Sequence, residues 1–241
     1  MRELNQTVTE ALLDPILARD PGGPRITYYD DSTGARIELS ALTLANWAAK
    51  TANLLRDEFG LTPGARVAVL LPAHWQTAAA LLGCWWAGVE VVLQPDADAE
   101  LALVTLDRVD DVAEVAEVAV LSLDPMGAPV RGLPVGLTDF ATAVRTHGDR
   151  FHPGGAGVAL SGLPVAEVLN RARKSAARQG FTADDRVLSE GGWGTPGELI
   201  DGLLAVWSSG ASLVQVVDAD PAQRDHRRAS ERVTMMRVLP R

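Results

Sequence analysis

The residues with the clearest chemical potential gather in two glycine-containing stretches. In His152 to Gly162, closely spaced glycines can bring backbone N–H groups near an anion, and a serine adds a hydroxyl. Glu190 to Thr195 follows a predicted parallel strand, and the carboxyl ends of such strands border ligand crevices in open α/β sheets. The candidate ligand-lining residues are therefore Gly154, Gly155, Gly157, Ser161, Ser189, Trp193 and Thr195.

Each stretch also has a simpler interpretation. Gly154 to Gly157 follows no predicted strand, so it lacks the context of a dinucleotide fingerprint, and a flexible loop is favoured. Ser161 is not a nucleophile elbow, because Ala159 and Leu163 stand where that motif needs glycine. Trp193 could stack on a base or an acyl group, but filling the seam between two half-sheets is the favoured role.

No catalytic or metal-binding residue is predicted elsewhere. The only two lysines, Lys50 and Lys174, lie inside predicted amphipathic helices. Cys84 stands among Leu and Trp residues and is expected to be a buried small hydrophobe. The four histidines are far apart in sequence, and no pair has the spacing of metal ligands.

Composition narrows the class of protein. The chain has 241 residues, 47% of them hydrophobic, and a formal net charge of −9. It has no basic stripe of the kind that nucleic-acid binding requires. No apolar run reaches the roughly 20 residues of a membrane span, and residues 1–10 do not resemble a signal peptide. We therefore expect a cytoplasmic protein that binds neither nucleic acid nor membrane.

Two parts of the chain look like copies of one another. Gly60-Leu-Thr-Pro-Gly-Ala-Arg-Val67 matches Gly180-Phe-Thr-Ala-Asp-Asp-Arg-Val187, and Gly88 matches Gly210. Each copy reads as helix, strand, apolar helix and strand, which predicts that the two units share one topology.

The fold class is therefore α/β, with two half-sheets of mainly parallel strands and helices packed between and around them. Strands are expected at 66–71, 89–93, 101–106 and 118–123 in one half and at 186–189, 211–217 and 232–238 in the other, joined by a hairpin region at 26–39. The expected division is an N-terminal subdomain at 1–150, a Gly-rich loop at 151–162 and a shorter subdomain at 163–241.

Several segments resemble the adenylate-forming enzymes, which include acyl-CoA synthetases. Ile26-Thr-Tyr28, Ala52-Asn-Leu-Leu55 and Gly64 to Pro72 are similar to the opening third of that superfamily, and Asp184 to Ser189 is similar to its middle section. Val233 to Pro240 is similar to the strand before its acyl-binding helix. The resemblance implies the fold of the large N-terminal domain, and it implies ATP, AMP or CoA as ligands.

The chain departs from this family at the residues that carry the reaction. The family has a Ser/Thr/Gly-rich phosphate loop ending in Pro-Lys-Gly before the helix that here starts near Pro164. The corresponding stretch, His152 to Gly162, has one hydroxyl and no lysine. The family's adenine-reading motif, hinge and C-terminal lid domain with its catalytic lysine have no counterpart here, so complete adenylation by this chain is not expected.

Two functions stay open. One is a pseudoenzyme that binds a partner or a small ligand, and the other is an enzyme fragment of the ligase class that binds nucleotide or acyl-CoA and is completed by another chain. We expect a homodimer or a protein partner, because the strand at 232–238 would leave an apolar face or an open edge. Arg232 and Arg237 favour the alternative that this face is polar.

Overall fold

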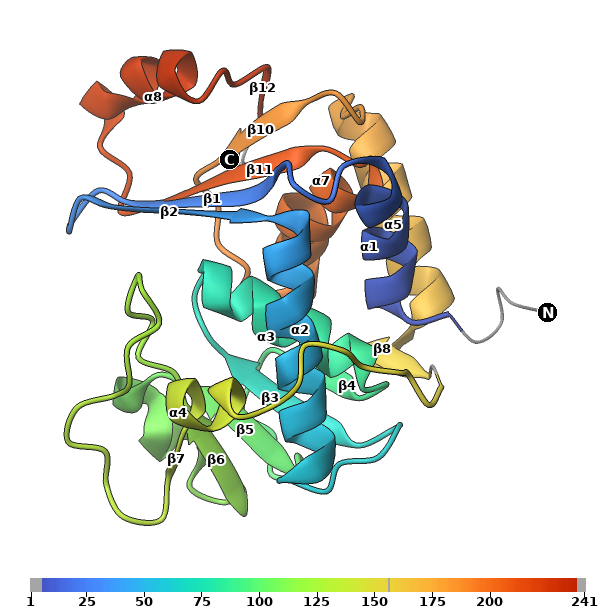
Figure 1. Cartoon of the computed structure of the whole chain (residues 1–241), viewed down its shortest axis with the longest axis vertical. Helices are drawn as coiled ribbons and strands as arrows, with labels where there is room; N and C mark the ends of the chain where they lie inside the picture. The colour runs from blue at the N-terminus through green and yellow to red at the C-terminus, as the bar shows by residue number, and fades with distance from the viewer. Residues whose placement is uncertain (1–5, 156, 238–241) are drawn as a thin grey trace.

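The computed structural model describes residues 6–155 and 157–237, and it contains two sheets with helices between and outside them (Figure 1). None of the described helices is long and apolar enough to cross a membrane. The predicted α/β architecture is confirmed, and in each sheet most neighbouring strands are parallel.

The first half of the chain builds most of the seven-stranded sheet, whose order is β7-β6-β5-β3-β4-β8-β9. Its strands are β3 (Arg66–Leu70), β4 (Glu90–Val92), β5 (Leu101–Val104), β6 (Glu117–Val120), β7 (Thr138–Asp139), β8 (Val158–Leu160) and β9 (Leu163–Pro164). Three of them, β3, β4 and β5, lie within two residues of the predicted ends, and β6 ends three residues before its predicted end. The helices are α2 (Ala41–Asp57), α3 (Trp75–Trp86), α4 (Phe140–Arg145) and the 3-10 helix η2 (Leu106–Val112).

The five-stranded sheet has the order β12-β10-β11-β1-β2. Its strands are β1 (Pro24–Asp30), β2 (Ala35–Ser40), β10 (Arg186–Ser189), β11 (Ser212–Val217) and β12 (Met235–Met236). Its helices are α5 (Val165–Gln179), α6 (Pro196–Leu199), the π-helix η3 (Ile200–Leu204) and α7 (Ala205–Ser208), followed by η4 (Pro221–Gln223) and α8 (Arg224–Ser230). Helix α1 (Val8–Arg19) precedes all of them.

The two repeated units have the same topology and the same turn geometry. Gly60 and Gly180 both have positive φ angles after the first helix of each unit, and so do Gly88 and Gly210 before the second strand. The backbone hydrogen bond Val89 N to Cys84 O (3.1 Å) corresponds to Ala211 N to Val206 O (3.1 Å). The internal repeat predicted from the sequence is therefore present in the structure.

A hairpin is exchanged between the repeats, which the sequence did not reveal. The β1–β2 hairpin precedes the first unit but pairs with β11 of the second, and the β8–β9 hairpin precedes the second unit but pairs with β4 of the first. Equivalent tryptophans of the two units each donate a hydrogen bond to the exchanged hairpin. The indole N–H of Trp85 donates to Ala159 O on β8 (2.8 Å), and that of Trp207 donates to Arg25 O on β1 (3.3 Å).

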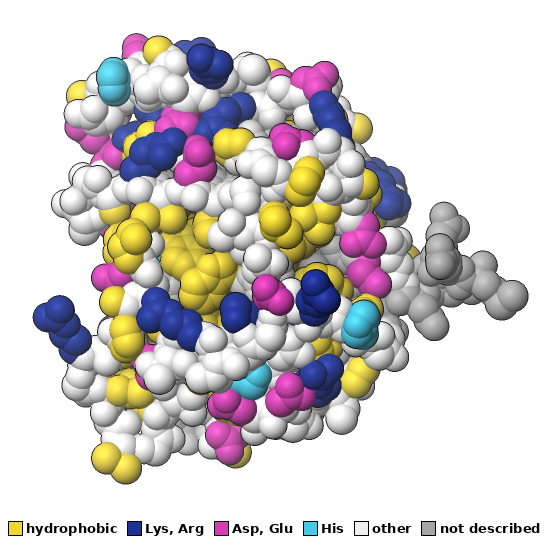
Figure 2. Space-filling view, in the orientation of Figure 1, with side chains coloured by type: hydrophobic (Ala, Val, Ile, Leu, Met, Phe, Trp, Pro, Cys, Tyr) yellow, Lys and Arg dark blue, Asp and Glu magenta, His cyan; other side chains and the backbone are white. Residues whose placement is uncertain are grey.

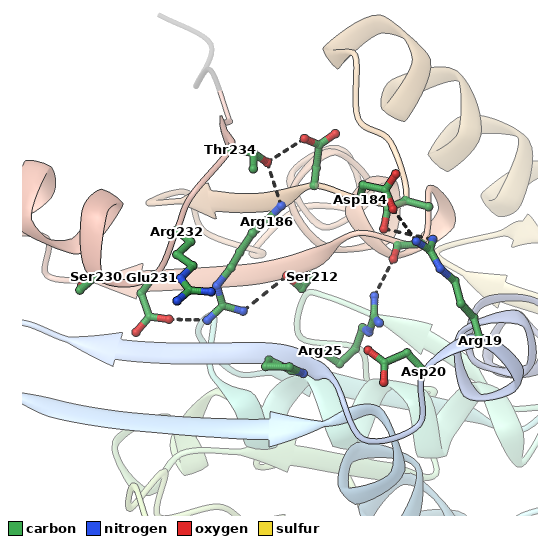
Figure 3. A pocket seen from close by; sticks show the side chains of 14 residues that line it. Arg19, Asp20, Arg25, Asp184, Arg186, Ser212, Ser230, Glu231, Arg232 and Thr234 are labelled. Atoms are coloured by element: carbon green, nitrogen blue, oxygen red, sulfur yellow. Dashed lines mark hydrogen bonds and ion pairs between the residues drawn. The ribbon is translucent and has the colours of Figure 1, made fainter.

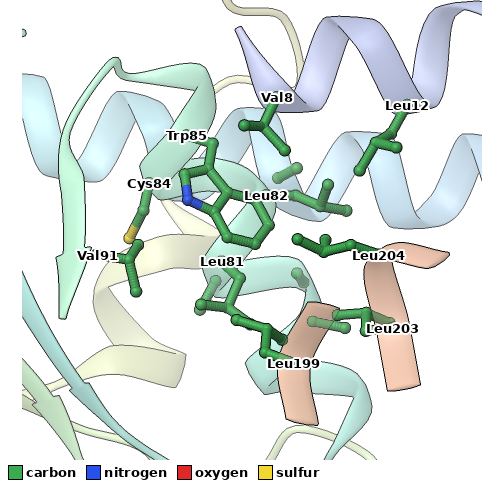
Figure 4. Close-up of a cluster of buried hydrophobic side chains, with 14 of the residues drawn as sticks. Val8, Leu12, Leu81, Leu82, Cys84, Trp85, Val91, Leu199, Leu203 and Leu204 are labelled. Atoms are coloured by element: carbon green, nitrogen blue, oxygen red, sulfur yellow. The ribbon is translucent and has the colours of Figure 1, made fainter. Parts of the chain in front are cut away.

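The largest hydrophobic core lies between the sheets (Figure 4). Leu81, Leu82 and Trp85 of α3 meet Leu199, Leu203 and Leu204 of the second unit, while Val8 and Leu12 of α1 close the cluster. Smaller clusters bury the outer faces of both sheets. Leu188, Val214 and Val216, on the outer face of the five-stranded sheet, are 1% exposed or less.

Two expectations need correction. The strand predicted at 232–238 is limited to Met235–Met236 in the described residues, because Arg232 has a positive φ of 52° and its N–H still bonds back to Ala229 O after α8. The stretch predicted as loop over 151–162 contains a strand, β8, because parallel pairing with β4 satisfies its backbone.

Candidate functional site

The turn between β8 and β9 occupies the place where the family resemblance implies a phosphate loop. Leu160 pairs with Leu163, so the turn has only two central residues, Ser161 and Gly162. Both have positive φ angles, 44° and 82°, as the tight primed turns of two-residue hairpins require.

The backbone donors of this turn are already committed. The N–H of Gly162 donates to Oε1 of Glu90 (2.7 Å), and the N–H of Ser161 donates to Val91 O (2.9 Å). Oε2 of Glu90 accepts a long hydrogen bond from Nε of Arg66 (3.4 Å), and Glu90 is only 9% exposed. A carboxylate therefore lies where an anionic ligand would need the Gly162 donor.

The remaining glycines of the predicted loop lie at the opposite end of the strands. A Cβ atom on Gly88, which precedes β4, would lie 2.6 Å from the carbonyl oxygen of Gly155. A Cβ atom on Gly154 would lie 3.6 Å from Cγ of Pro63, and the carbonyl of Gly157 accepts from Val165 N (3.2 Å). Gly154, Gly155 and Gly157 thus border the amino end of β4, whereas Ser161 follows the carboxyl end of β8.

The second group, at the end of β10, is mostly buried. Oγ of Ser189 accepts from Gly191 N (3.3 Å), and Trp193 is 2% exposed within the main core. Thr195 forms a capping box with Glu198 at the start of α6. The position of Trp193 is the one expected of a seam-filling side chain. The seven candidates therefore fall into three separate places instead of one site.

The same region holds polar residues that the sequence did not suggest as a site. Arg237 is 6% exposed, and a Cβ on Gly202 would lie 3.0 Å from its Nη1. Its Nε, the Nε1 of Trp193 and the Oε1 of Gln215 are buried without a hydrogen-bond partner. Burial lowers the pKa of Arg237 from its ordinary value. The expectation that Arg237 makes this face polar is wrong: it lies on the inner face with Met235, whereas Met236 between them packs on the outer face.

A cavity lies at the carboxyl ends of β5 and β6 and beneath the β1–β2 hairpin. Its volume is about 750 Å³. It is lined by Tyr28, Asp30, Thr33, Ala35, Thr105, Leu106, Asp107, Leu121, Ser122, Leu123, Asp124, Pro125, Ala128, Pro129, Val130 and Arg131. Figure 2 shows hydrophobic side chains gathered in a hollow of the surface, left of the centre of the view. None of the seven predicted candidates lines this cavity.

Two smaller cavities lie at the amino ends of β10 and β11, and charged side chains line the larger of them, about 520 Å³ (Figure 3). Four arginines and four acidic residues line it, so their charges balance, and four of these eight residues form two ion pairs. Arg186 bonds Glu231, Arg19 bonds Asp184, and Asp185 accepts from Thr182 and Thr234. The third cavity, about 270 Å³, adjoins it next to α1. Because positive and negative side chains balance, this cavity has little net charge with which to select a charged ligand.

Comparisons with known proteins agree with this fold. A family model described as AMP-binding enzyme matches residues 18–141. A TIGR03089 family protein from Mycobacterium tuberculosis is 58% identical over 241 residues, covering 97% of this chain and 98% of that protein.

Solved structures of larger enzymes share the architecture. Acyl-CoA synthetase from Brucella canis superposes with a TM-score of 0.78 at 18% identity, over 96% of this chain and 47% of that chain. Apo MatB from Rhodopseudomonas palustris gives 0.76 at 19% identity, over 96% and 49%. The chain spans about half the length of these structures. It belongs to the AMP-binding enzyme family and, within it, to the TIGR03089 family, and it has the fold of the N-terminal half of acyl-CoA synthetases.

Proposed function

We propose that this chain is a binding protein that does not carry out adenylation by itself. The two-residue turn at Ser161 and Gly162, with its Gly162 donor held by Glu90, is the observation that carries the proposal. Adenylation requires preorganised donors and cations around the transferring phosphate, where negative charge develops. A buried carboxylate at that position has the opposite effect.

The two lysines do not supply the missing charge. Nζ of Lys50, on α2, donates to the carbonyl of His147. Lys174 lies in the interior of α5, about two and a half turns beyond the β8–β9 hairpin, and its side chain is exposed. Neither lysine is placed to contact an anion at the Ser161–Gly162 turn.

Pyrophosphate exchange with ATP and a panel of carboxylic acids tests this proposal. An active acyl-CoA synthetase under the same conditions serves as the positive control. We expect no exchange above the protein-free rate, both for the native chain and for Glu90→Gln, because removing the charge does not lengthen the turn. Robust exchange by the isolated native chain would refute the proposal.

A second function is favoured by the cluster around Arg237. The Arg237 guanidinium is buried, its Nη1 donates a long hydrogen bond to Oγ of Ser189 (3.5 Å), and its Nε has no partner among the described residues. A buried charge of this kind is costly unless an anion neutralises it. In one similar structure, an anthranilate CoA ligase holds anthranoyl-AMP. The alternative is therefore a nucleotide- or acyl-CoA-binding fragment of the ligase class, which another chain would complete.

Calorimetry with ATP, AMP and acyl-CoAs separates the two functions. The fragment hypothesis predicts saturable binding that Arg237→Gln weakens and that Arg232→Gln, at a neighbouring exposed position, leaves unchanged. Absence of binding for all three ligands, or equal loss in both variants, would leave only the first proposal.

A further inference from the structure

The 750 Å³ cavity lies at the carboxyl ends of β5 and β6, next to a switch point in the order of the strands. From β3 the chain passes through α3 to β4 on one side, and the next strand, β5, lies on the other side of β3. Helix α3 packs into the core between the sheets, whereas η2, which follows β5, packs on the outer face. The connections after β3 and β5 thus diverge, and the carboxyl edge between such strands is where open α/β sheets form ligand crevices.

The cavity combines an apolar wall with a negative charge. Leu106, Leu121 and Leu123 contribute to the wall, and Asp30, Asp107 and Asp124 outnumber the single cation, Arg131. Partial burial alone would raise the pKa of Asp30, but hydrogen bonds from Ser32 and Thr33 hold it below its ordinary value, so this carboxyl is ionised at neutral pH. A site with this balance of charge disfavours phosphates and carboxylates.

Two of the three carboxylates are occupied within their own loops. Asp30 accepts hydrogen bonds from Ser32 and Thr33, and Oδ1 of Asp124 accepts from the N–H groups of Met126 (2.8 Å) and Ala128 (3.1 Å). Asp107, in the first turn of η2, is exposed and has no such bond within the described part of the chain. Asp107 is therefore the carboxylate available to a ligand.

Tyr28 supplies a polar group on the opposite side. It is 6% exposed and lines the cavity, and its ring meets His74 edge-on with 4.3 Å between centroids. Among the described residues its hydroxyl makes no side-chain hydrogen bond, and the oxygen is not one of the fully buried unpartnered atoms, so it is accessible to a ligand in the cavity. Burial raises the pKa of Tyr28 to about 12, so the hydroxyl stays neutral and can donate or accept.

We infer that this cavity binds a protonated organic amine with an apolar body. The ammonium group faces Asp107 within the negative field of Asp30 and Asp124, the apolar body lies against Leu106, Leu121 and Leu123, and a polar atom of the ligand pairs with the hydroxyl of Tyr28. The inference rests on the binding role proposed above and names the chemical class of one ligand for it.

Titration of the full chain with phenethylamine and with 2-phenylethanol tests the inference, because the two probes match in size and differ in charge. We expect phenethylamine to bind in the millimolar range and at least threefold more tightly than the alcohol. In ¹⁵N-labelled protein the affected amides should include 105–107 and 121–123.

Asp107→Asn should weaken phenethylamine binding about threefold to tenfold and leave the alcohol unchanged. Asp110→Asn is the matched control: it removes the same charge from the same exposed 3-10 helix at a position that does not line the cavity. Equal binding of both probes, or equal loss in both variants, would overturn the inference. Pyrophosphate exchange measured on the same samples keeps this outcome separate from the proposal on adenylation, which exchange alone decides.

Discussion

Alanine substitutions at four glycines test the repeat and the position of the glycine loop together. Gly60 and Gly180 are equivalent, with φ angles of 65° and 75°, and so are Gly88 and Gly210, with 76° and 84°. All four backbones adopt the left-handed conformation that penalises a side chain. The pairs differ in the space around the added Cβ, which therefore decides the relative cost.

The magnitudes follow from that geometry. At Gly60 the new Cβ meets nothing within 4 Å, and at Gly180 it meets only Met235 at 3.8 Å, so backbone strain alone costs about 1 kcal/mol. At Gly210 the Cβ of Ala183 lies 3.1 Å away, which raises the cost to about 2 kcal/mol. At Gly88 a backbone oxygen, that of Gly155, lies 2.6 Å away and cannot swing aside, so we expect about 3 kcal/mol.

Urea unfolding followed by tryptophan fluorescence measures these differences, and calorimetry should show Tm losses of about 3 °C for Gly60→Ala and about 9 °C for Gly88→Ala. Gly60→Ala is the matched control for Gly88→Ala, because it carries the same backbone penalty without the contact. The expected difference between the two variants is about 2 kcal/mol in the free energy of unfolding. If both variants lose the same free energy of unfolding, to within about 0.5 kcal/mol, the loop at Gly155 does not pack against Gly88.

Three further predictions concern titratable groups and association. Burial alone would raise the pKa of Glu231, but hydrogen bonds from Arg36, Tyr29 and Arg186 lower it to about 2 from 4.5. The stabilisation that the ionised Glu231 provides is thus present above pH 4.5 and lost as the pH falls toward 2. Between these pH values the free energy of unfolding of the native chain should fall by about 2 kcal/mol on this account, and Glu231→Gln should not show this part of the fall. Burial raises the pKa of the Cys84 thiol to about 12, so a disulfide reagent should label it only in urea, and rapid labelling of native protein would contradict its burial. Self-association stays a prediction, now through the open edge of β2, and a light-scattering mass near 25.6 kDa at every concentration would count against it.

The sequence predicted local elements well because their signals are local. Glycines with positive φ stop helices at Gly60 and Gly180, and apolar runs such as Val67 to Leu70 identify strands buried on both faces. The hairpin exchange has no such signal. The residue types of Ile26 to Tyr29 do not indicate that β1 pairs with β11, nearly two hundred residues later in the chain. Pairing over that separation depends on how the core packs.

The candidate site was harder to predict for a related reason. Gly154 and Ser161 are seven residues apart, yet they border opposite ends of β8, since an extended strand carries the chain across the sheet. Arg237 looked like a surface residue by its type, and only the direction of its strand shows that it is buried. The 750 Å³ cavity could not be predicted from the sequence, because its polar residues, such as Tyr28, Asp107 and Asp124, are far apart along the chain.

The hairpin exchange explains how that cavity forms. All of its lining residues precede residue 132, yet they come from two sheets: Tyr28 to Ala35 belong to the five-stranded sheet, and Thr105 to Arg131 follow strands of the seven-stranded sheet. The first group is held over the second because β1 pairs with β11 through the register Ile26 to Leu213. The cavity therefore depends on the second repeat, although no residue of that repeat lines it, and the two halves of the chain act as one structural unit.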